Sequence, residues 1–307
     1  MDTDRLVLRR LALTRGWSDD ELARHVRGGD LTRLRRGAYV IGADALTVEA
    51  RHRLLVSATM ASLRRPAVVS HQSAAVLHGL PLWGVRLDRV HVTRRRPASS
   101  EVGRFLHAHV TRLADHEVTE VDGLPVTDPV RTALDLARPL PLEPAVVLLD
   151  AALHHGLVQQ PLLAGRVQEM TGTRGSRAAA RALDLADARS ESAGESRSRV
   201  LLHRLGLAPS TLQRIIRSES GRELGRVDFA WEEERVVGEF DGRIKYGRGL
   251  RPGQDPGEVV FEEKRREDAI RDEDWGVVRW IWAELVPGTV VGERVRRARA
   301  RGRRRRG

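Results

Sequence analysis

Three acidic residues interrupt two short apolar runs in the last third of the chain. Asp228 lies within RVDFAW, and Glu239 and Asp241 lie within RVVGEFDG. Three glutamates separate the runs, a pattern that predicts a β-hairpin with its charged turn in solvent. Residues two apart on a strand face the same side, so Glu239 and Asp241 should lie together, with Asp228 close by on the paired strand. We therefore expect three carboxylates to converge.

Carboxylates held this close repel one another unless a cation or a proton lies between them. Magnesium prefers a few carboxylates together with water and substrate phosphate, so Mg²⁺ held by Asp228, Glu239 and Asp241 is the simplest interpretation. Such a site activates water for phosphodiester cleavage. The alternative is an exposed hairpin whose acids are solvated.

The two lysines of the chain, Lys245 and Lys264, both follow this acidic cluster, whereas the other cationic side chains are arginines. An ammonium group is a compact charge that can approach a phosphate or a metal-bound water, unlike the planar guanidinium. We expect one of the two lysines to position the attacking water or to stabilise the phosphate in the transition state.

The stretch from roughly residue 190 to 285 resembles the PD-(D/E)XK nuclease fold. Within that fold it is most similar to the uncharacterised domain related to the very-short-patch repair endonuclease. The resemblance implies Glu195 as the acid of the preceding helix, Asp228 as the strand acid and Glu239 as the first residue of the (D/E)XK element. Glu195 also completes a capping box with Ser192, a role that does not exclude a place in the site.

The chain departs from this nuclease pattern at the lysine. Asp241 stands two residues after Glu239, where the lysine is usual. Lys245 falls where the repair-like relatives tend to have histidine, and Lys264 on the following helix would supply a displaced lysine.

Composition limits the class of protein. A chain of 307 residues should form two or three domains, and the lack of cysteine excludes disulfides, zinc fingers and thiol chemistry and fits a reducing cytoplasm. No apolar signal core or membrane-length run is present. The net charge of +11 favours a polyanion such as DNA as partner, although much of the excess lies in the tail RVRRARARGRRRRG.

The first 45 residues show the pattern of a winged helix-turn-helix. Residues 5–13 and DDELARHV predict short helices, Leu31–Arg36 the recognition helix or its end, and GAYVIG a strand of the wing. The arginines expected to face phosphates or base edges are Arg33, Arg35 and Arg36. The alternative is a helical subdomain whose arginines are solvated.

Histidines recur between residues 71 and 109. His71 and His78 lie seven apart on a predicted helix and so share a face, whereas His91, His107 and His109 fall on predicted strands. Their spacing matches no metal-ligand pattern, which favours packed or hydrogen-bonded histidines over ligands.

Roughly residues 5–155 are similar to AbiEi-type antitoxins of abortive-infection systems, as found in actinobacteria. The resemblance is carried by five segments in order: LRRGAYV, SHQSAAVLHGLPL, VHVT, GLPVTDPVRTALDLA and LLDAAL. In that family the winged helix binds the operator, and the following domain neutralises a nucleotidyltransferase-like toxin. The resemblance implies a DNA-binding regulator with such a toxin as partner. A nuclease-like unit after the antitoxin-like part departs from the standard layout.

The sequence therefore predicts an α/β (α+β) chain in four parts. These are a winged-helix domain at 1–45, an antitoxin-like α/β and helical region at 46–189, an endonuclease-like domain at 190–290 and a disordered arginine-rich tail at 291–307. The predicted function is that of a cytoplasmic DNA-binding regulator carrying a Mg²⁺-dependent endonuclease-like domain. The alternative is a non-catalytic repressor or antitoxin in which the nuclease fold serves only for binding.

Overall fold

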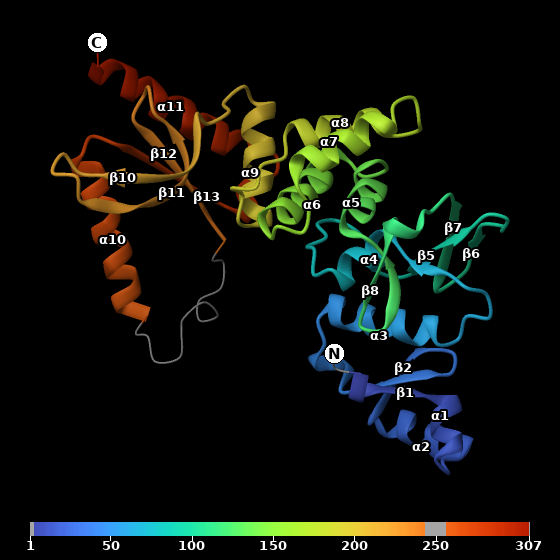
Figure 1. Cartoon of the computed structure of the whole chain (residues 1–307). Helices are drawn as coiled ribbons and strands as arrows, with labels where there is room; N and C mark the ends of the chain where they lie inside the picture. The colour runs from blue at the N-terminus through green and yellow to red at the C-terminus, as the bar shows by residue number, and fades with distance from the viewer. Residues whose placement is uncertain (1–2, 243–255, 307) are drawn as a thin grey trace. The chain divides into compact units, whose positions relative to one another are not determined.

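The computed structural model describes residues 3–242 and 256–306 and mixes helices with sheets, which confirms the α/β class (Figure 1). The chain forms two compact units. The N-terminal unit comprises Met1–Leu148 and Gly156–Leu183, and the C-terminal unit comprises Leu149–His155 and Asp184–Gly307. The main division lies close to the boundary expected at residues 189–190. No helix within the described ranges combines the length and apolar character needed to cross a membrane.

A three-stranded antiparallel sheet in the order β1-β3-β2 opens the N-terminal unit. Its elements are β1 (Leu6–Leu8), α1 (Arg9–Thr14), α2 (Asp19–Gly28), β2 (Leu31–Arg35) and β3 (Ala38–Ile41). The helix predicted over residues 5–13 is therefore a strand followed by a helix, and the recognition helix predicted at Leu31–Arg36 is wrong, because that segment is β2. Gly29, at φ 85°, ends α2, and Gly37, at φ 77°, turns the chain into β3. The few residues between these breaks are too short for a stable helix, and they pair with β3 instead.

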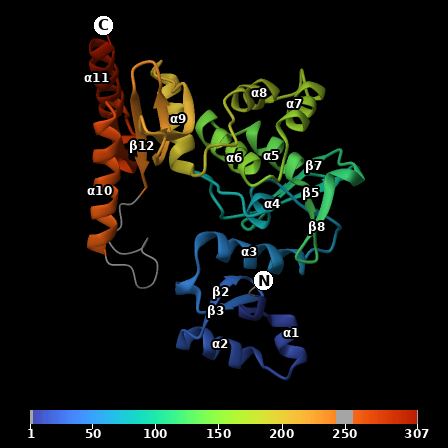
Figure 2. The ribbon, with the colours of Figure 1, turned by 60° about the vertical axis from the view of Figure 1, so that its left-hand side comes forward.

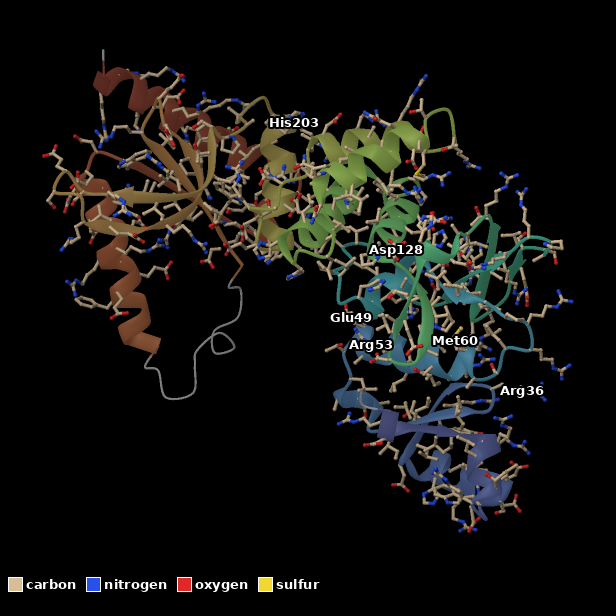
Figure 3. The ribbon with its side chains drawn as sticks, viewed as in Figure 1. Arg36, Glu49, Arg53, Met60, Asp128 and His203 are labelled. Carbon is tan, nitrogen blue, oxygen red and sulfur yellow. The ribbon has the colours of Figure 1, made fainter. Side chains whose placement is uncertain are left out.

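A six-stranded mixed sheet in the order β6-β7-β5-β4-β9-β8 forms the centre of the same unit. Its strands are β4 (Val68–Val69), β5 (Val90–Arg95), β6 (Glu101–Val102), β7 (Leu106–Thr111), β8 (Val118–Val121) and β9 (Leu124–Thr127). The helices that follow the small sheet are α3 (Val48–Met60), α4 (His71–Leu77), α5 (Pro129–Ala137), α6 (Leu142–His154), α7 (Gln160–Glu169) and α8 (Ser176–Asp184). Buried residues of α3 and α4 share one apolar core with β4, β5, β7 and β9. Asp128 (Figure 3) caps α5 and is followed by proline in the first turn.

The C-terminal unit is built on a four-stranded sheet in the order β10-β11-β12-β13. Its strand β12 and its helices are labelled in Figure 2. Its elements are α9 (Ala193–Arg204), β10 (Thr211–Arg217), β11 (Glu223–Trp231), β12 (Val236–Asp241), α10 (Pro256–Asp272), β13 (Gly276–Ile281) and α11 (Thr289–Arg306). Strands β11 and β12 form the predicted antiparallel hairpin, and β13 is parallel to β12. Trp231 and Trp280 lie in the core under α9 and α11, while Ile270 of α10 packs on the opposite face.

The prediction that the tail is disordered from residue 291 is wrong, because this segment forms α11. Small apolar side chains recur along it at helical spacing, and Val291, Val295 and Ala298 are buried against the sheet. At Gly302 the helix comes so close to the chain that a Cβ would lie 1.9 Å from the backbone oxygen of Glu234. An arginine-rich segment thus folds because one face of it supplies core contacts.

The hairpin turn is also less exposed than its three glutamates suggested. Glu234 is buried, with its side-chain Oε1 accepting hydrogen bonds from Arg299 (2.8 Å) and Arg303 (2.8 Å) of α11. These two guanidinium groups lower the pKa of Glu234 against the opposing effect of burial. The arginines of the tail therefore hold the hairpin turn as well as facing solvent.

Candidate functional site

Asp228 on β11 is the most perturbed carboxyl group of the predicted site. Its Oδ2 accepts a hydrogen bond from the backbone N–H of Phe240 at 2.8 Å. Burial raises the pKa of Asp228 from 3.8 to about 7; the Phe240 N–H opposes this, and the carboxylates of Glu195, Glu239 and Glu191 add to it. A carboxyl group in this state releases its proton readily when a cation arrives.

Glu239 on β12 faces two arginines. Its Oε1 accepts a hydrogen bond from Nη2 of Arg266 on α10 at 2.7 Å. Its Oε2 lies 2.7 Å from Nη2 of Arg279, the residue beside it in the parallel pairing with β13. Arg279 also forms ion pairs with Glu263 and Glu267 of α10. The carboxylate of Glu239 is therefore neutralised by protein cations.

Ser192 caps α9 as predicted, but the capping box is incomplete, because the side chain of Glu195 accepts from the Ser192 hydroxyl and the Glu191 N–H rather than from the Ser192 N–H. The backbone N–H of Glu195 donates to Ser192 Oγ at 3.2 Å, and its Oε1 accepts from the same hydroxyl at 2.7 Å. Its Oε2 accepts from the Glu191 N–H and from Gln213 Nε2, each at 2.9 Å. Its carboxylate also raises the pKa of Asp228.

Two of the remaining predicted residues lie at the end of β12 and on α10. Asp241 ends β12 beside Ile281 of β13, and Lys264 is exposed on α10. Lys245 lies outside the described residues. Among residues 3–242 and 256–306, the group of three potential ligands whose atoms lie within 4.8 Å of one another is His71, His91 and His109, not the carboxylates.

Sequence reasoning missed the two arginines that hold Glu239. Arg279 carried a signal, because it interrupts the apolar run GVVRWIW on a strand that has to pack beside the hairpin. Arg266 had none, because it is one of several basic residues in EEKRREDAIR. It is Arg266, two positions after Lys264, that reaches the carboxylate.

Two of the three predicted DNA-facing arginines lie open to solvent. Arg33 on β2 is exposed. Arg36 at the following turn is also exposed and is labelled in Figure 3. Arg35 is partly buried and donates a hydrogen bond to Thr59 Oγ1 of α3 at 2.9 Å, and burial lowers its pKa. The hairpin β2–β3 therefore presents Arg33 and Arg36, and Arg35 fastens it to α3.

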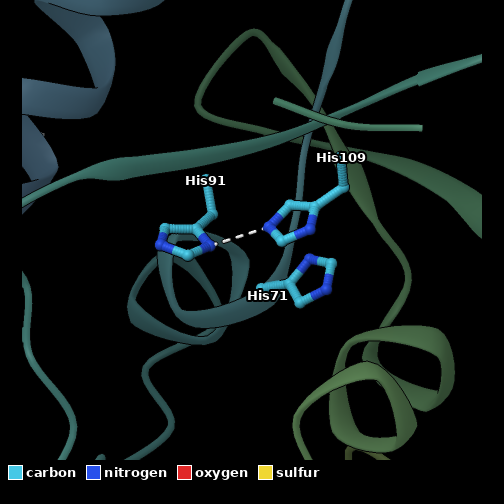
Figure 4. A group of neighbouring side chains, drawn as sticks. All are labelled: His71, His91 and His109. Carbon is cyan, nitrogen blue, oxygen red and sulfur yellow. Dashed lines mark hydrogen bonds between the residues drawn. The ribbon is translucent and has the colours of Figure 1, made fainter. Parts of the chain in front are cut away.

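The histidines are packed or hydrogen-bonded, as expected, but three of them also meet (Figure 4). His91 Nδ1 lies 2.9 Å from His109 Nε2 in a hydrogen bond. The rings of His71 and His109 stack with centroids 3.8 Å apart. His78, at the end of α4, has its Nε2 2.8 Å from the backbone oxygen of Thr127.

Comparison with known proteins finds similar sequences but no matching protein family. No protein-family profile matches the chain. The uncharacterized proteins MT2308 and Rv2248 of two Mycobacterium tuberculosis strains are each 34% identical to it over 185 residues, which is 60% of this chain. The chain spans 62% of the length of these curated relatives. The crystal structure of RV2827C protein from Mycobacterium tuberculosis is similar with a TM-score of 0.39 and 16% identity, over 69% of this chain and 80% of that one.

Proposed function

We propose that this chain is a cytoplasmic DNA-binding protein whose C-terminal unit is a Mg²⁺-dependent, endonuclease-like domain. The observation that carries the proposal is the carboxyl group of Asp228, which is partly buried beside Glu195, Glu239 and Glu191 and has its pKa raised to about 7. An acid in such surroundings is a candidate for a functional site, because a purely structural carboxylate is stabilised by cations rather than by other acids.

The order of elements supports the nuclease-like part. Helix α9 carries Glu195, the hairpin β11–β12 carries Asp228 and Glu239, and helix α10 leads to β13, which pairs in parallel with β12. The PD-(D/E)XK fold that the chain resembles has its helix acid, its two strand acids and the following helix and strand in the same order.

The residues fit a hard cation in chemistry, since all the donors are carboxylate oxygens, and Asp228 and Glu239 would hold it. When bound, Mg²⁺ would polarise a phosphate and lower the pKa of a water molecule. Glu239 must leave Arg266 and Arg279 before it can bind an ion. The freed guanidinium groups would then neutralise the phosphate in the bidentate manner that arginine favours.

The N-terminal unit would supply DNA binding. Two helices followed by the β2–β3 hairpin form the order of a winged helix. The helix that enters the groove would then be α2, since the segment first expected to do so is strand β2. Arg33 and Arg36 on the hairpin would contact phosphates. The AbiEi resemblance implies a nucleotidyltransferase-like toxin as a protein partner of this unit.

Plasmid cleavage tests the activity. We expect the wild-type protein to cut supercoiled DNA in Mg²⁺ or Mn²⁺, and Asp228→Asn to lose this activity at least about a hundredfold. Asp272→Asn is the matched control, because Asp272 is an exposed acid of the same unit. Cutting that survives in Asp228→Asn would remove the proposed centre.

A second candidate is a non-catalytic regulator, and the pairing of both Glu239 oxygens with Arg266 and Arg279 favours it. In that case the arginines permanently take the place of a metal ion. The wild type would then leave plasmid intact in either metal while still shifting DNA in a gel. Replacing Arg33 and Arg36 with alanine would weaken that shift and reduce its dependence on salt.

A further inference from the structure

Three histidines from separate elements of the N-terminal unit converge in the structure. His71 begins α4, His91 lies on β5 and His109 lies on β7 (Figure 4). Strands β5 and β7 are parallel with Thr93 beside His109, so His91, two residues before Thr93, is on the same face as His109. One ring nitrogen from each histidine lies within 4.8 Å of those of the other two.

Neighbouring polar groups fix the orientation of these rings. Ser70 Oγ is 3.0 Å from Nδ1 of His71, and Gln72 Nε2 is 2.7 Å from Nε2 of His91. Because an amide nitrogen only donates, the proton of His91 is then on Nδ1 and is donated to Nε2 of His109. In metal-ligating histidines the outer partner accepts the N–H on the far side of the ring, so Gln72 would have to present its carbonyl oxygen to His91 when an ion binds.

The cluster is uncharged at neutral pH. Burial, together with neighbouring basic groups, lowers the pKa of His71 to about 3, that of His91 to about 2 and that of His109 to about 3. A neutral imidazole is the form that offers a lone pair to a metal.

Hydrogen bonding alone accounts poorly for this arrangement. One hydrogen bond joins His91 to His109, whereas the third ring, His71, contacts His109 by stacking. His107 stacks on the other side, with its centroid 3.9 Å from that of His109. Rings packed only for their apolar surface have no need to bring three ring nitrogens within 4.8 Å of one another.

We propose that His71, His91 and His109 bind a divalent first-row transition ion, with Zn²⁺ as the representative. Imidazole nitrogens suit such an ion, whereas Mg²⁺ prefers oxygen ligands. In a tetrahedral zinc site with Zn–N bonds of about 2.05 Å, the nitrogens are roughly 3.3 Å apart, against up to 4.8 Å here. The rings must therefore move together, and the stacked rings of His71 and His109, whose planes are 14° apart, must turn so that both nitrogen lone pairs face the ion. Three protein ligands leave the fourth position to water or another small ligand.

Metal binding requires one proton to move. The ion would replace the hydrogen bond between His91 and His109, and His91 would shift its proton from Nδ1 to Nε2. Turning the side-chain amide of Gln72 would then present its carbonyl oxygen to that N–H. The site would tie the start of α4 to β5 and β7, and it is independent of the proposed nuclease centre.

Zinc titration of the full-length protein in competition with a chromophoric chelator tests this proposal. We expect one Zn²⁺ per chain in the wild type and at least about tenfold weaker binding in His91→Gln and in His109→Gln. His116→Gln is the matched control, because His116 is an exposed histidine of the same unit. Equal binding by all four proteins would overturn the proposal.

A second measurement keeps the test decisive if a variant does not fold. Cobalt-loaded wild-type protein should show the intense visible bands of a four-coordinate ion with nitrogen ligands. Only the weak spectrum of hydrated Co²⁺ would overturn the proposal. Asp228→Asn should retain the full zinc stoichiometry, which separates this site from the proposed magnesium centre.

Discussion

The raised pKa of Asp228 makes the stability of the C-terminal unit depend on pH. The folded-state pKa is about 7, against 3.8 for an unperturbed aspartate. Because the folded state binds the proton more tightly, this group stabilises the fold below about pH 4, and that contribution is lost as the pH rises through 7. A shift of about three units corresponds to about 4 kcal/mol.

Asp228→Asn removes the titration while keeping an oxygen that can accept the Phe240 N–H. We expect the variant to be more stable than the wild type by about 4 kcal/mol at pH 8 and by less than about 1 kcal/mol at pH 4. Urea unfolding followed by tryptophan fluorescence measures this, since four of the six tryptophans lie in the C-terminal unit: Trp231, Trp275, Trp280 and Trp282.

Magnesium provides the internal control for this experiment. An ion that binds ionised Asp228 would stabilise the wild type at pH 8 and reduce its difference from Asp228→Asn. A difference between the two proteins that stays constant from pH 4 to pH 8 would refute the reasoning, since no group would then titrate abnormally at this position.

Three further changes test the packing. Deleting residues 289–307 should lower the free energy of unfolding of the C-terminal unit by about 3 to 6 kcal/mol, because buried valines of α11 leave the core. The urea transition of this unit should then be lost, and an unchanged midpoint would show that α11 is dispensable. Gly302→Ala should cost about 1 to 3 kcal/mol in the same assay, since its Cβ meets the backbone oxygen of Glu234; a neutral result would mean that the contact is loose. Arg199→Met should cost about 3 to 5 kcal/mol, because Asp150, which is 1% exposed, loses its ion pair. Adding Asp150→Asn should restore part of that loss, and no restoration would contradict this cause.

The hairpin was predictable from the sequence because its signal is local. Two runs of alternating apolar residues on either side of a charged turn define β11 and β12, and Asp228 and Glu239 fall on adjacent strands as expected. The capping of α9 by Ser192 and the helix start at Asp128 were predictable for the same reason.

Features that depend on tertiary contacts were not predictable in this way. The arginine-rich tail has a charge pattern typical of disorder, and only its packing against the sheet makes it a helix. Its spacing of Val291, Val295 and Ala298 was nevertheless a signal. The pairing of Glu239 with Arg266 and Arg279 depends on how α10 and β13 lie beside β12.

The histidine cluster shows the same limit. The alternation of His107 and His109 predicts a shared strand face, but the parallel pairing with His91 and the position of His71 over that face come from the sheet order. Sequence spacing alone therefore matched no ligand pattern.

The claim on which the proposed activity depends is that Asp228 takes part in binding a divalent ion. Calorimetric titration of Mg²⁺ at pH 7 in two buffers with different ionisation enthalpies tests it directly. A carboxyl group with a pKa of about 7 should release about half a proton per bound ion, so the apparent heats should differ between the buffers. Equal heats in both buffers, or no binding of Mg²⁺, would contradict the account.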